Sequence, residues 1–493
     1  MYLARSVGTW PTRHGIELLG RHRFANLTAA ALPKSVLDCD YAVRGDVLIK
    51  AGELQTILDR KDGSLPFSRI VPCNIGNPQA VGARPLNFYR QVIACLAEPS
   101  LIDHDGLFAS DVRERAQHFL SGANGKLGAY SDSKGHLVFR KEVAKFLEAR
   151  DGFAADPEHI FLSDGASPSV KLALQLVIGG KDDGVLLPIP QYPLYSASMT
   201  LLGGQAVGYF LDESSGWGTD VKELERSISE FRAKGGTPRA LVVINPGNPT
   251  GGVLPRSQME AVIRVCEQNK MVLLADEVYQ DNIYADNVSF VPFRKVVQEM
   301  GSKIELFSFH SVSKGVVGEC GLRGGFVHCH NVEQGVIDQM YKLCSVNLCS
   351  NTLGQAAMAL SLTGPPANGP SRAAYEAEKN AVRGALKRKA RMTYERLNAV
   401  EGISCQPIAG AMYAFPKIEV KGEMTKKAAS LGKPVDAVYC MELLLNKGIV
   451  VVPGSGFGQV PGTFHFRTTI LPDEDTLANV LDSIADFHKR HAS

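Results

Sequence analysis

From about residue 156 onward, short apolar runs of strand-forming residues alternate with helical patterns. The runs lack strict polar alternation, which is typical of strands that are covered on both faces. Helical stretches such as 169–177 and 257–269 space their apolar residues for one buried face. The alternation predicts βαβ units around a mostly parallel sheet. The expected strands are HIFLS at 159–163, GVLLP at 184–188, ALVVIN at 240–245, MVLLADE at 271–277 and IELFSFH at 304–310.

A second, smaller region is expected toward the C-terminus. The chain has 493 residues, and a single hydrophobic core stops growing near ~250 to 300 residues. The alternation ends at the turn-rich Gly364-Pro365-Pro366, and a long charged helix over 371–399 follows. The remainder, about 400–493, predicts a smaller α+β domain with HFRTTIL at 465–471 as one strand.

The composition is that of a soluble globular protein. It is 45% hydrophobic and 21% charged with a net charge of +2, so it offers no basic surplus for nucleic acid. The ten cysteines form no Cys-x-x-Cys pair and no zinc-spaced cluster, so neither a disulfide framework nor a metal site is expected, and a reducing compartment fits best. No apolar run approaches the ~18 to 20 residues of a membrane span.

The first 37 residues are basic, with one acid, Glu17, against five basic side chains. This pattern resembles an organellar transit peptide, and a basic extension without a targeting role fits it equally well. Cytoplasm and mitochondrion therefore both stay open. The basic residues are Arg5, Arg13, Arg21, Arg23 and Lys34.

One lysine follows a predicted strand in the string SFHSVSKGVVGECGLRGG at 308–325. Lys314 becomes a nucleophile if its amine is partly buried beside other positive charge, such as Arg323. Taken alone, it is better interpreted as a surface lysine in a glycine-rich loop. Ser311-x-x-Lys314 also matches a serine acyl-enzyme signature, which we reject because Ser-Asp-Asn and Lys-Thr-Gly are missing.

A carboxylate ends the buried run VLLADEVYQ at 272–280. Asp276 is costly there unless it is paired, and a protonated pyridine nitrogen would be a suitable partner. The alternative is that Asp276 caps the next helix.

Two further loops leave predicted strands. VVINPGNPTGG at 242–252 predicts a rigid turn with one Asn-Pro bond as a candidate for the cis form, and Asn248 offers an amide donor. LSDGASPSV at 162–170 predicts strand, turn and helix, with N–H groups at the helix end suited to phosphate and Ser167 adding a hydroxyl. Ser167 could equally be an ordinary N-cap before a proline. GSGFG at 454–458 lacks the glycine spacing of a dinucleotide site, so NAD is rejected.

These strings, with PQYPLY at 190–195 and FRTTIL at 466–471, resemble the class I aminotransferases of the fold type I pyridoxal-phosphate enzymes. The resemblance covers nearly everything from Asp40 to the end. DYAVRGD at 40–46, IPQYPLYSA at 189–197 and the insert Gly318-Glu319-Cys320 are most similar to the alanine aminotransferase subgroup.

The resemblance implies an α/β fold with a large domain around a mostly parallel sheet and a smaller α+β domain. It implies a homodimer with shared active sites, and ping-pong transfer of the amino group between L-alanine and 2-oxoglutarate, giving pyruvate and L-glutamate. The expected segments are 1–37, the basic extension; 38–115, which joins the small domain and dimer contacts; 116–370, the large cofactor-binding domain; and 371–493, the small domain.

The resemblance also implies roles around pyridoxal 5'-phosphate. Lys314 carries the cofactor as a Schiff base and then moves the proton between the substrate α-carbon and the cofactor. Asp276 pairs with the pyridine nitrogen, and Tyr279 and Asn248 donate to the ring oxygen. Tyr192 stacks on the ring, although alone it is better interpreted as a core aromatic.

For the phosphate, the implied ligands are the N–H groups of Ala166 and Ser167, the Ser311 hydroxyl and the Arg323 guanidinium. Tyr130, in GAYSDSKG, resembles the tyrosine that reaches the phosphate from the neighbouring subunit. The alternative interpretation of Tyr130 is a tyrosine in a turn without a role in the site.

The substrate α-carboxylate is implied to bind Arg467, with help from Asn248 and the backbone at Gly76. No second arginine for a side-chain carboxylate is identifiable, so a small uncharged donor is favoured. The alternatives are a glutamate-glyoxylate or other class I aminotransferase, an aminocyclopropane-carboxylate synthase-like lyase, and a catalytically dead homologue that acts as a scaffold.

Overall fold

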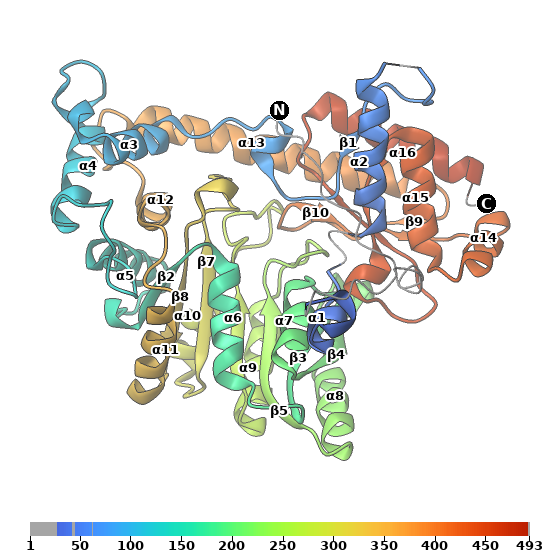
Figure 1. Cartoon of the computed structure of the whole chain (residues 1–493), viewed down its shortest axis with the longest axis horizontal. Helices are drawn as coiled ribbons and strands as arrows, with labels where there is room; N and C mark the ends of the chain where they lie inside the picture. The colour runs from blue at the N-terminus through green and yellow to red at the C-terminus, as the bar shows by residue number, and fades with distance from the viewer. Residues whose placement is uncertain (1–26, 42–44, 62, 492–493) are drawn as a thin grey trace.

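A seven-stranded sheet forms the centre of the larger part of the molecule, in the computed structural model that describes residues 27–41, 45–61 and 63–491 (Figure 1). Its order is β2-β8-β7-β6-β5-β3-β4. Only β8 runs antiparallel to its neighbours among these seven strands, so the prediction of a mostly parallel sheet is confirmed. The strands are β2 (Ile160–Ser163), β3 (Asp183–Ile189), β4 (Gln205–Phe210), β5 (Thr237–Ile244), β6 (Val272–Asp276), β7 (Leu306–Ser311) and β8 (Gly325–His330).

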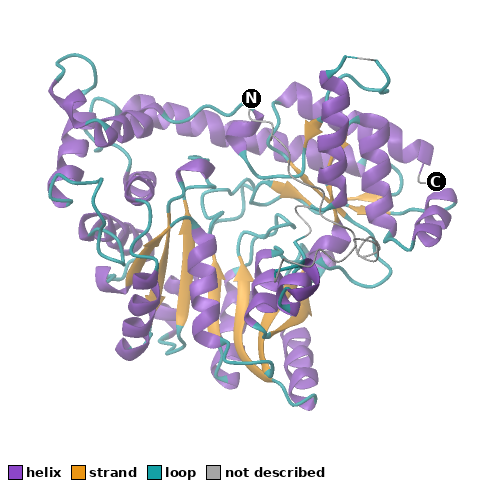
Figure 2. Cartoon of the chain, viewed as in Figure 1, coloured by secondary structure: helices purple, strands orange, loops and turns teal. Residues whose placement is uncertain are grey.

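Helices cover both faces of this sheet (Figure 2). Val185 and Leu187 of β3 point to the face packed against α6, α7 and α11, whereas Leu186 points to the face packed against α8, α9 and α10. Burial on both faces explains why these strands carry no polar alternation. The helices are α6 (Ala166–Val177), α7 (Leu194–Leu202), α8 (Val221–Ala233), α9 (Arg256–Asn269), α10 (Phe293–Met300) and α11 (Gln334–Val346).

A separate helical cluster flanks the β2 edge of the sheet. It shares one apolar core with β2 and β8 and consists of α3 (Asn87–Ala97), α4 (Ser110–Gly122), α5 (Leu137–Asp151) and α12 (Thr352–Thr363). From this cluster α13 (Arg372–Asn398) crosses the molecule to the C-terminal part (Figure 1), which matches the charged helix predicted over 371–399.

The C-terminal part consists of short strands and three α-helices in its described residues, and the N-terminal chain joins it. β1 pairs with β12 in parallel, and α2 packs against α15. A three-stranded sheet has the order β10-β14-β13, and β11 pairs with β9. The elements are α2 (Asp46–Asp59), β1 (Val71–Pro72), β9 (Ile403–Ser404), β10 (Tyr413–Ala414), β11 (Lys417–Ile418), α14 (Glu423–Leu431), α15 (Val435–Lys447), β12 (Ile449–Val450), β13 (Val452–Pro453), β14 (Phe466–Thr469) and α16 (Glu474–His491).

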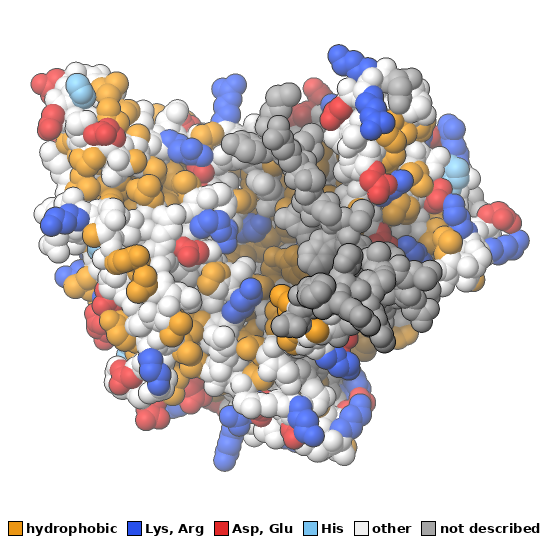
Figure 3. Space-filling view, in the orientation of Figure 1, with side chains coloured by type: hydrophobic (Ala, Val, Ile, Leu, Met, Phe, Trp, Pro, Cys, Tyr) orange, Lys and Arg blue, Asp and Glu red, His pale blue; other side chains and the backbone are white. Residues whose placement is uncertain are grey.

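Much of the basic N-terminal segment, residues 1–26, lies outside the described residues, which begin just before α1 (Lys34–Leu37). No helix in the described ranges is long and apolar enough to cross a membrane. On the face drawn in Figure 3, acidic and basic side chains are interspersed rather than separated by sign.

Candidate active site

A cavity of about 280 Å³ lies at the carboxyl ends of β5, β6 and β7, where an open α/β sheet binds its ligands. It brings together side chains that are far apart in the sequence, and every predicted site residue except Tyr130 lines it. Those residues are Gly76, Ala166, Ser167, Tyr192, Asn248, Asp276, Tyr279, Ser311, Lys314, Arg323 and Arg467.

Lys314 lies in the loop directly after β7, and its amine faces the cavity. The Nζ atom donates to the carbonyl oxygen of Gly76 at 2.8 Å and lies 5.7 Å from the centre of the Tyr279 ring. Among the described residues it has no acidic partner within ion-pair distance. The interpretation of Lys314 as an exposed surface lysine is therefore wrong, and its amine is available to a ligand.

Asp276 ends β6 with only 5% of its surface exposed. Its carboxylate accepts a hydrogen bond from the Tyr195 hydroxyl at 2.9 Å. Burial raises the pKa of Asp276 to about 6, although Tyr195, the Val278 amide and the Lys314 charge oppose that rise. The cost of burying this carboxylate is incompletely offset within the chain, so a cationic ligand atom beside it would stabilise the site.

The helix-cap interpretation of Asp276 is wrong. The next helix, α10, begins at Phe293, and the Phe293 amide donates to the neighbouring carboxylate, Glu277, at 2.7 Å. Glu277 is itself buried, and burial raises its pKa to about 7. The two adjacent acids thus have different roles: Glu277 accepts a hydrogen bond at the start of α10, and Asp276 faces the cavity.

The first turn of α6 and Arg323 converge on one side of the cavity. The Arg323 guanidinium donates to the carbonyl of Asp164 at 2.7 Å and to the Ser313 hydroxyl at 3.3 Å. A Cβ atom on Gly165 would lie 2.3 Å from that guanidinium, so the glycine, at φ 84°, lets it lie against the start of the helix. Helix N–H groups, a guanidinium and the Ser311 hydroxyl together form a donor set suited to a phosphate.

Ser167 is not the N-cap of α6, which was its alternative role. The helix begins at Ala166 after Gly165, so Ser167 lies inside the first turn.

Asn248 follows β5 in a turn whose two Asn-Pro bonds, at Pro246 and Pro249, are both cis, whereas one cis bond was expected from the sequence.

Arg467 on β14 is 1% exposed, and its described surroundings provide no carboxylate. It donates to the Asn248 side-chain oxygen at 3.1 Å and to the backbone carbonyl of Asn74, and its Nε atom has no partner. Its guanidinium also lies 4.2 Å from the centre of the Tyr413 ring. A buried cation without a counter-charge is costly, so this position favours an anionic ligand.

Tyr41, Cys320 and Tyr413 also line the cavity, and Tyr195 holds Asp276 from outside its lining; these residues were not assigned to the site from the sequence. The Tyr413 hydroxyl accepts a hydrogen bond from Tyr279 at 3.4 Å. Burial alone would raise the pKa of Tyr413, but the charges of Lys314 and Arg467 outweigh it and lower that pKa. The Tyr41 and Tyr192 hydroxyls are 2.8 Å apart at the cavity wall. Tyr41, Tyr195 and Cys320 lie within motifs that already carried the family resemblance. Tyr413 lies in AMYAF, outside every such motif, so no sequence signal pointed to it.

The profile of the family "Aminotransferase class I and II" matches residues 103–484. The chain belongs to this family. The aminotransferase is 45% identical to a "Probable alanine aminotransferase, mitochondrial" of Dictyostelium discoideum, over 94% of this chain and 89% of that protein. It is also 45% identical to "Glutamate--glyoxylate aminotransferase 1" of Arabidopsis thaliana, over 93% of this chain and 95% of that protein. An aminotransferase from Escherichia coli shares its fold with a TM-score of 0.74 at 25% identity, covering 94% of this chain and 99% of that one.

Proposed function

We propose that this aminotransferase moves the amino group between L-alanine and 2-oxoglutarate in a ping-pong reaction that yields pyruvate and L-glutamate. The observation that carries the proposal is the buried guanidinium of Arg467, which has no carboxylate partner among the described residues, in the cavity that holds Lys314. The other arginine lining this cavity, Arg323, lies at the start of α6, so one guanidinium remains for a substrate carboxylate. That arrangement favours a small uncharged side chain on the donor, and the alanine aminotransferase relatives support the same donor.

The cavity fits pyridoxal 5'-phosphate as its cofactor. Asp276 is a buried carboxylate without a basic side chain in contact, which suits a protonated ring nitrogen. The donor set at Gly165 suits the phosphate: the amides of Ala166 and Ser167, the Ser311 hydroxyl and Arg323. Asn248 and Tyr279 would donate to the ring oxygen, and Tyr192 would lie against the ring. When bound, the cofactor supplies an electron sink for the negative charge that develops at the substrate α-carbon.

The chain's own residues then have three tasks. Lys314 holds the cofactor through its amine. Once that amine is free of the cofactor, it moves the proton at the substrate α-carbon. Arg467 binds the substrate α-carboxylate, while Asn248 and the backbone at Gly76 orient it. Tyr195 keeps the Asp276 carboxylate in place through their hydrogen bond.

A homodimer would complete the site. Tyr130 does not line the cavity of its own chain and is 77% exposed. Two other large apolar side chains, Val346 and Leu348, are also exposed. They lie near the Tyr130 loop, as the hydrogen bond from Ser133 to the Leu348 carbonyl at 2.7 Å shows. Exposed apolar side chains that gather in this way favour a subunit interface, from which Tyr130 would reach the partner's phosphate.

A matrix of substrates tests the reaction. Alanine, glycine, serine and glutamate are offered as donors, each against 2-oxoglutarate, pyruvate and glyoxylate, and kcat/KM is measured for each pair. The alanine and 2-oxoglutarate pair should give the highest value. A higher value for glutamate with glyoxylate would establish the second candidate, which the Arabidopsis relative supports. Absence of turnover in every pair would favour a scaffold.

For localisation we propose cytoplasm, mitochondrion or both. A mitochondrial relative and the basic composition of residues 1–37 support a mitochondrial pool. Imaging a fluorescent protein fused to residues 1–37, beside a variant with the five basic residues changed to glutamine, would separate the compartments.

A further inference from the structure

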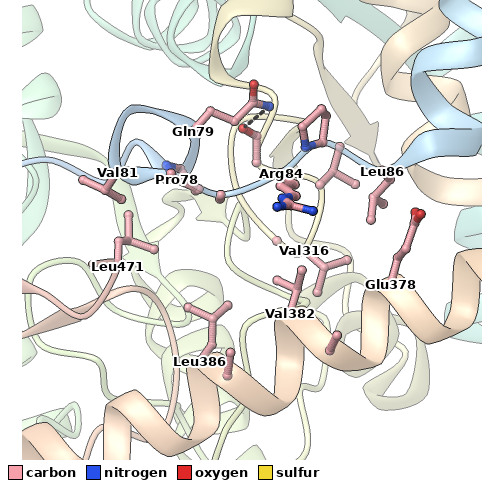
Figure 4. A pocket seen from close by; sticks show the side chains of 18 of the residues that line it. Pro78, Gln79, Val81, Arg84, Leu86, Val316, Glu378, Val382, Leu386 and Leu471 are labelled. Atoms are coloured by element: carbon pink, nitrogen blue, oxygen red, sulfur yellow. Dashed lines mark hydrogen bonds between the residues drawn. The ribbon is translucent and has the colours of Figure 1, made fainter. Parts of the chain in front are cut away.

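A second cavity, of about 640 Å³, is lined by residues 315–318, the loop that follows Lys314 (Figure 4). Its other walls are the segment 78–87, one face of α13, and Met412, Leu471 and Asp473 from the C-terminal part. It therefore lies between the two parts of the molecule, and none of its lining residues lines the Lys314 cavity.

Small residues keep this cavity open. The α13 face presents Ala381 and Ala385 between larger neighbours, at the spacing of one helical face. In the segment 78–87, a Cβ on Gly82 would meet no atom within 4 Å apart from its chain neighbours. The rest of the wall is mainly apolar: Val81, Leu86, Val316, Val382, Leu386 and Leu471.

The charged groups around the cavity differ in whether they already have partners. Glu378 accepts hydrogen bonds from the Asn87 backbone and side chain, and Asp473 accepts one from the Thr476 amide. Lys389 donates to the Leu471 carbonyl at 2.9 Å. Arg84 is an exposed side chain at the cavity wall, and it has neither an ion pair nor a side-chain hydrogen bond within the described part of the chain (Figure 4).

We propose that this cavity binds a small molecule with an apolar body and one carboxylate, which Arg84 holds. The volume falls in the range of about 300 to 1,000 Å³ that is typical of ligand pockets. A guanidinium can bind a carboxylate through two parallel hydrogen bonds. Glu378 and Asp473 are held by amide donors, whereas Arg84 has no partner among the described residues, so we assign the charged end of the ligand to Arg84. The site does not depend on the proposed reaction.

A ligand bound in this cavity would affect the loop that carries Lys314. Gln79 donates to the Gly318 carbonyl at 3.3 Å, and the Gly318 amide donates to the Lys314 carbonyl at 3.2 Å. The segment that carries Gln79 continues from Gly76, the acceptor of the Lys314 amine. A ligand between these two segments contacts both supports of Lys314 without touching Arg467, so it should alter kcat rather than exclude substrate.

Decanoate is a suitable probe, titrated calorimetrically into the purified holoenzyme. One molecule should bind per subunit. Ala385→Phe fills the hollow and should weaken binding at least about tenfold, with Val382→Trp as a second filling variant should the first not fold. Arg84→Gln should weaken decanoate binding by about threefold to fivefold, because it removes an ion pair at an exposed arginine. 1-Decanol should bind wild type and Arg84→Gln equally. Circular dichroism and basal turnover show that each variant is folded.

Several results would overturn the proposal. They are no saturable binding of decanoate, equal decanoate affinity in folded Ala385→Phe, or equal decanoate affinity in Arg84→Gln. Competitive inhibition against alanine would place the probe in the Lys314 cavity instead. If decanoate fails to bind and Ala385→Phe shifts the protein toward monomer in sedimentation, the cavity is covered by a second subunit.

Discussion

A single amine decides the chemistry proposed for this cavity. Lys314→Ala removes both the group that holds the cofactor and the proton carrier, while the loop around it keeps its backbone bonds. Transamination should fall below about one percent of wild type, because general acid-base groups alone contribute about 10²- to 10⁴-fold. Steady-state turnover measures this, with Lys171→Ala on the exposed side of α6 as the matched control. Turnover of several percent in Lys314→Ala would reject the assignment.

Asp276 gives a prediction with a defined pH dependence. Burial raises its pKa from 3.8 to about 6, so the native cofactor-free protein binds more protons than the unfolded chain between those values. Its stability therefore falls as pH rises through this window, and the penalty is complete above pH 6. A shift of about two units corresponds to on the order of 3 kcal/mol.

Asp276→Asn keeps an acceptor for Tyr195 but cannot ionise. The cofactor-free variant should match wild type near pH 4 and unfold at a higher temperature at pH 8, as measured by scanning calorimetry. The same variant should bind pyridoxal phosphate more weakly, because the partner of the ring nitrogen is lost. A stability difference that stays constant from pH 4 to 8 would mean that this carboxylate is not the source.

At the scale of elements, the start of α6 depends on one glycine. Gly165→Ala places a Cβ against the Arg323 guanidinium at a φ of 84°, which side chains rarely adopt. Strain of this kind costs about 1 to 3 kcal/mol, and the phosphate donors would separate. Cofactor affinity, measured by equilibrium dialysis, should fall by about tenfold or more.

Gly180→Ala, in the turn that follows the other end of α6, is the control, because a Cβ there meets no atom within 4 Å apart from its chain neighbours. It should retain wild-type cofactor affinity. Equal affinity in Gly165→Ala and Gly180→Ala would show that Arg323 and the first turn of α6 do not act together on the phosphate.

The strands and the loops after them could be predicted because their signals are local. An apolar run followed by polar residues places Asp276, Asn248 and Lys314 at one edge of the sheet whatever the rest of the chain does. The contacts of Tyr413 with Tyr279 and of Tyr41 with Tyr192 join residues 134 and 151 positions apart. Such contacts depend on how the C-terminal and N-terminal segments lie over the sheet, and no local pattern encodes that.

Across the whole molecule, the domain limits at 37/38, 115/116 and 370/371 stay predictions. The structure adds one physical reason for the second segment: β1 and α2 pack with β12 and α15, so the N-terminal chain is held by the C-terminal part. The chain between α2 and α3 then passes the cavity at Gly76, whose carbonyl accepts a hydrogen bond from Lys314. The N-terminal chain therefore connects the C-terminal part to the loop that carries Lys314.

The last prediction concerns assembly. If Tyr130 completes the partner's phosphate site, Tyr130→Phe should lose cofactor more readily by about one hydrogen bond to a charged group, roughly 1.5 to 3 kcal/mol, with unchanged substrate preference. Retention after dialysis, read from the cofactor's absorbance, measures the loss. Tyr341→Phe, another tyrosine near this loop through its bond to Asp132, is the matched control and should retain cofactor as wild type does.

Mixing subunits decides which chain Tyr130 serves. A heterodimer of Tyr130→Phe and Lys314→Ala holds one site with both defects and one with neither, provided that Tyr130 acts across the interface. After random exchange in limiting cofactor, about a quarter of all sites should be intact, and activity should exceed the average of the two parent proteins. If Tyr130 instead serves its own subunit, every site carries one defect and the activity stays at that average. Native mass spectrometry verifies the exchange, so an unchanged activity in verified heterodimers excludes the shared site.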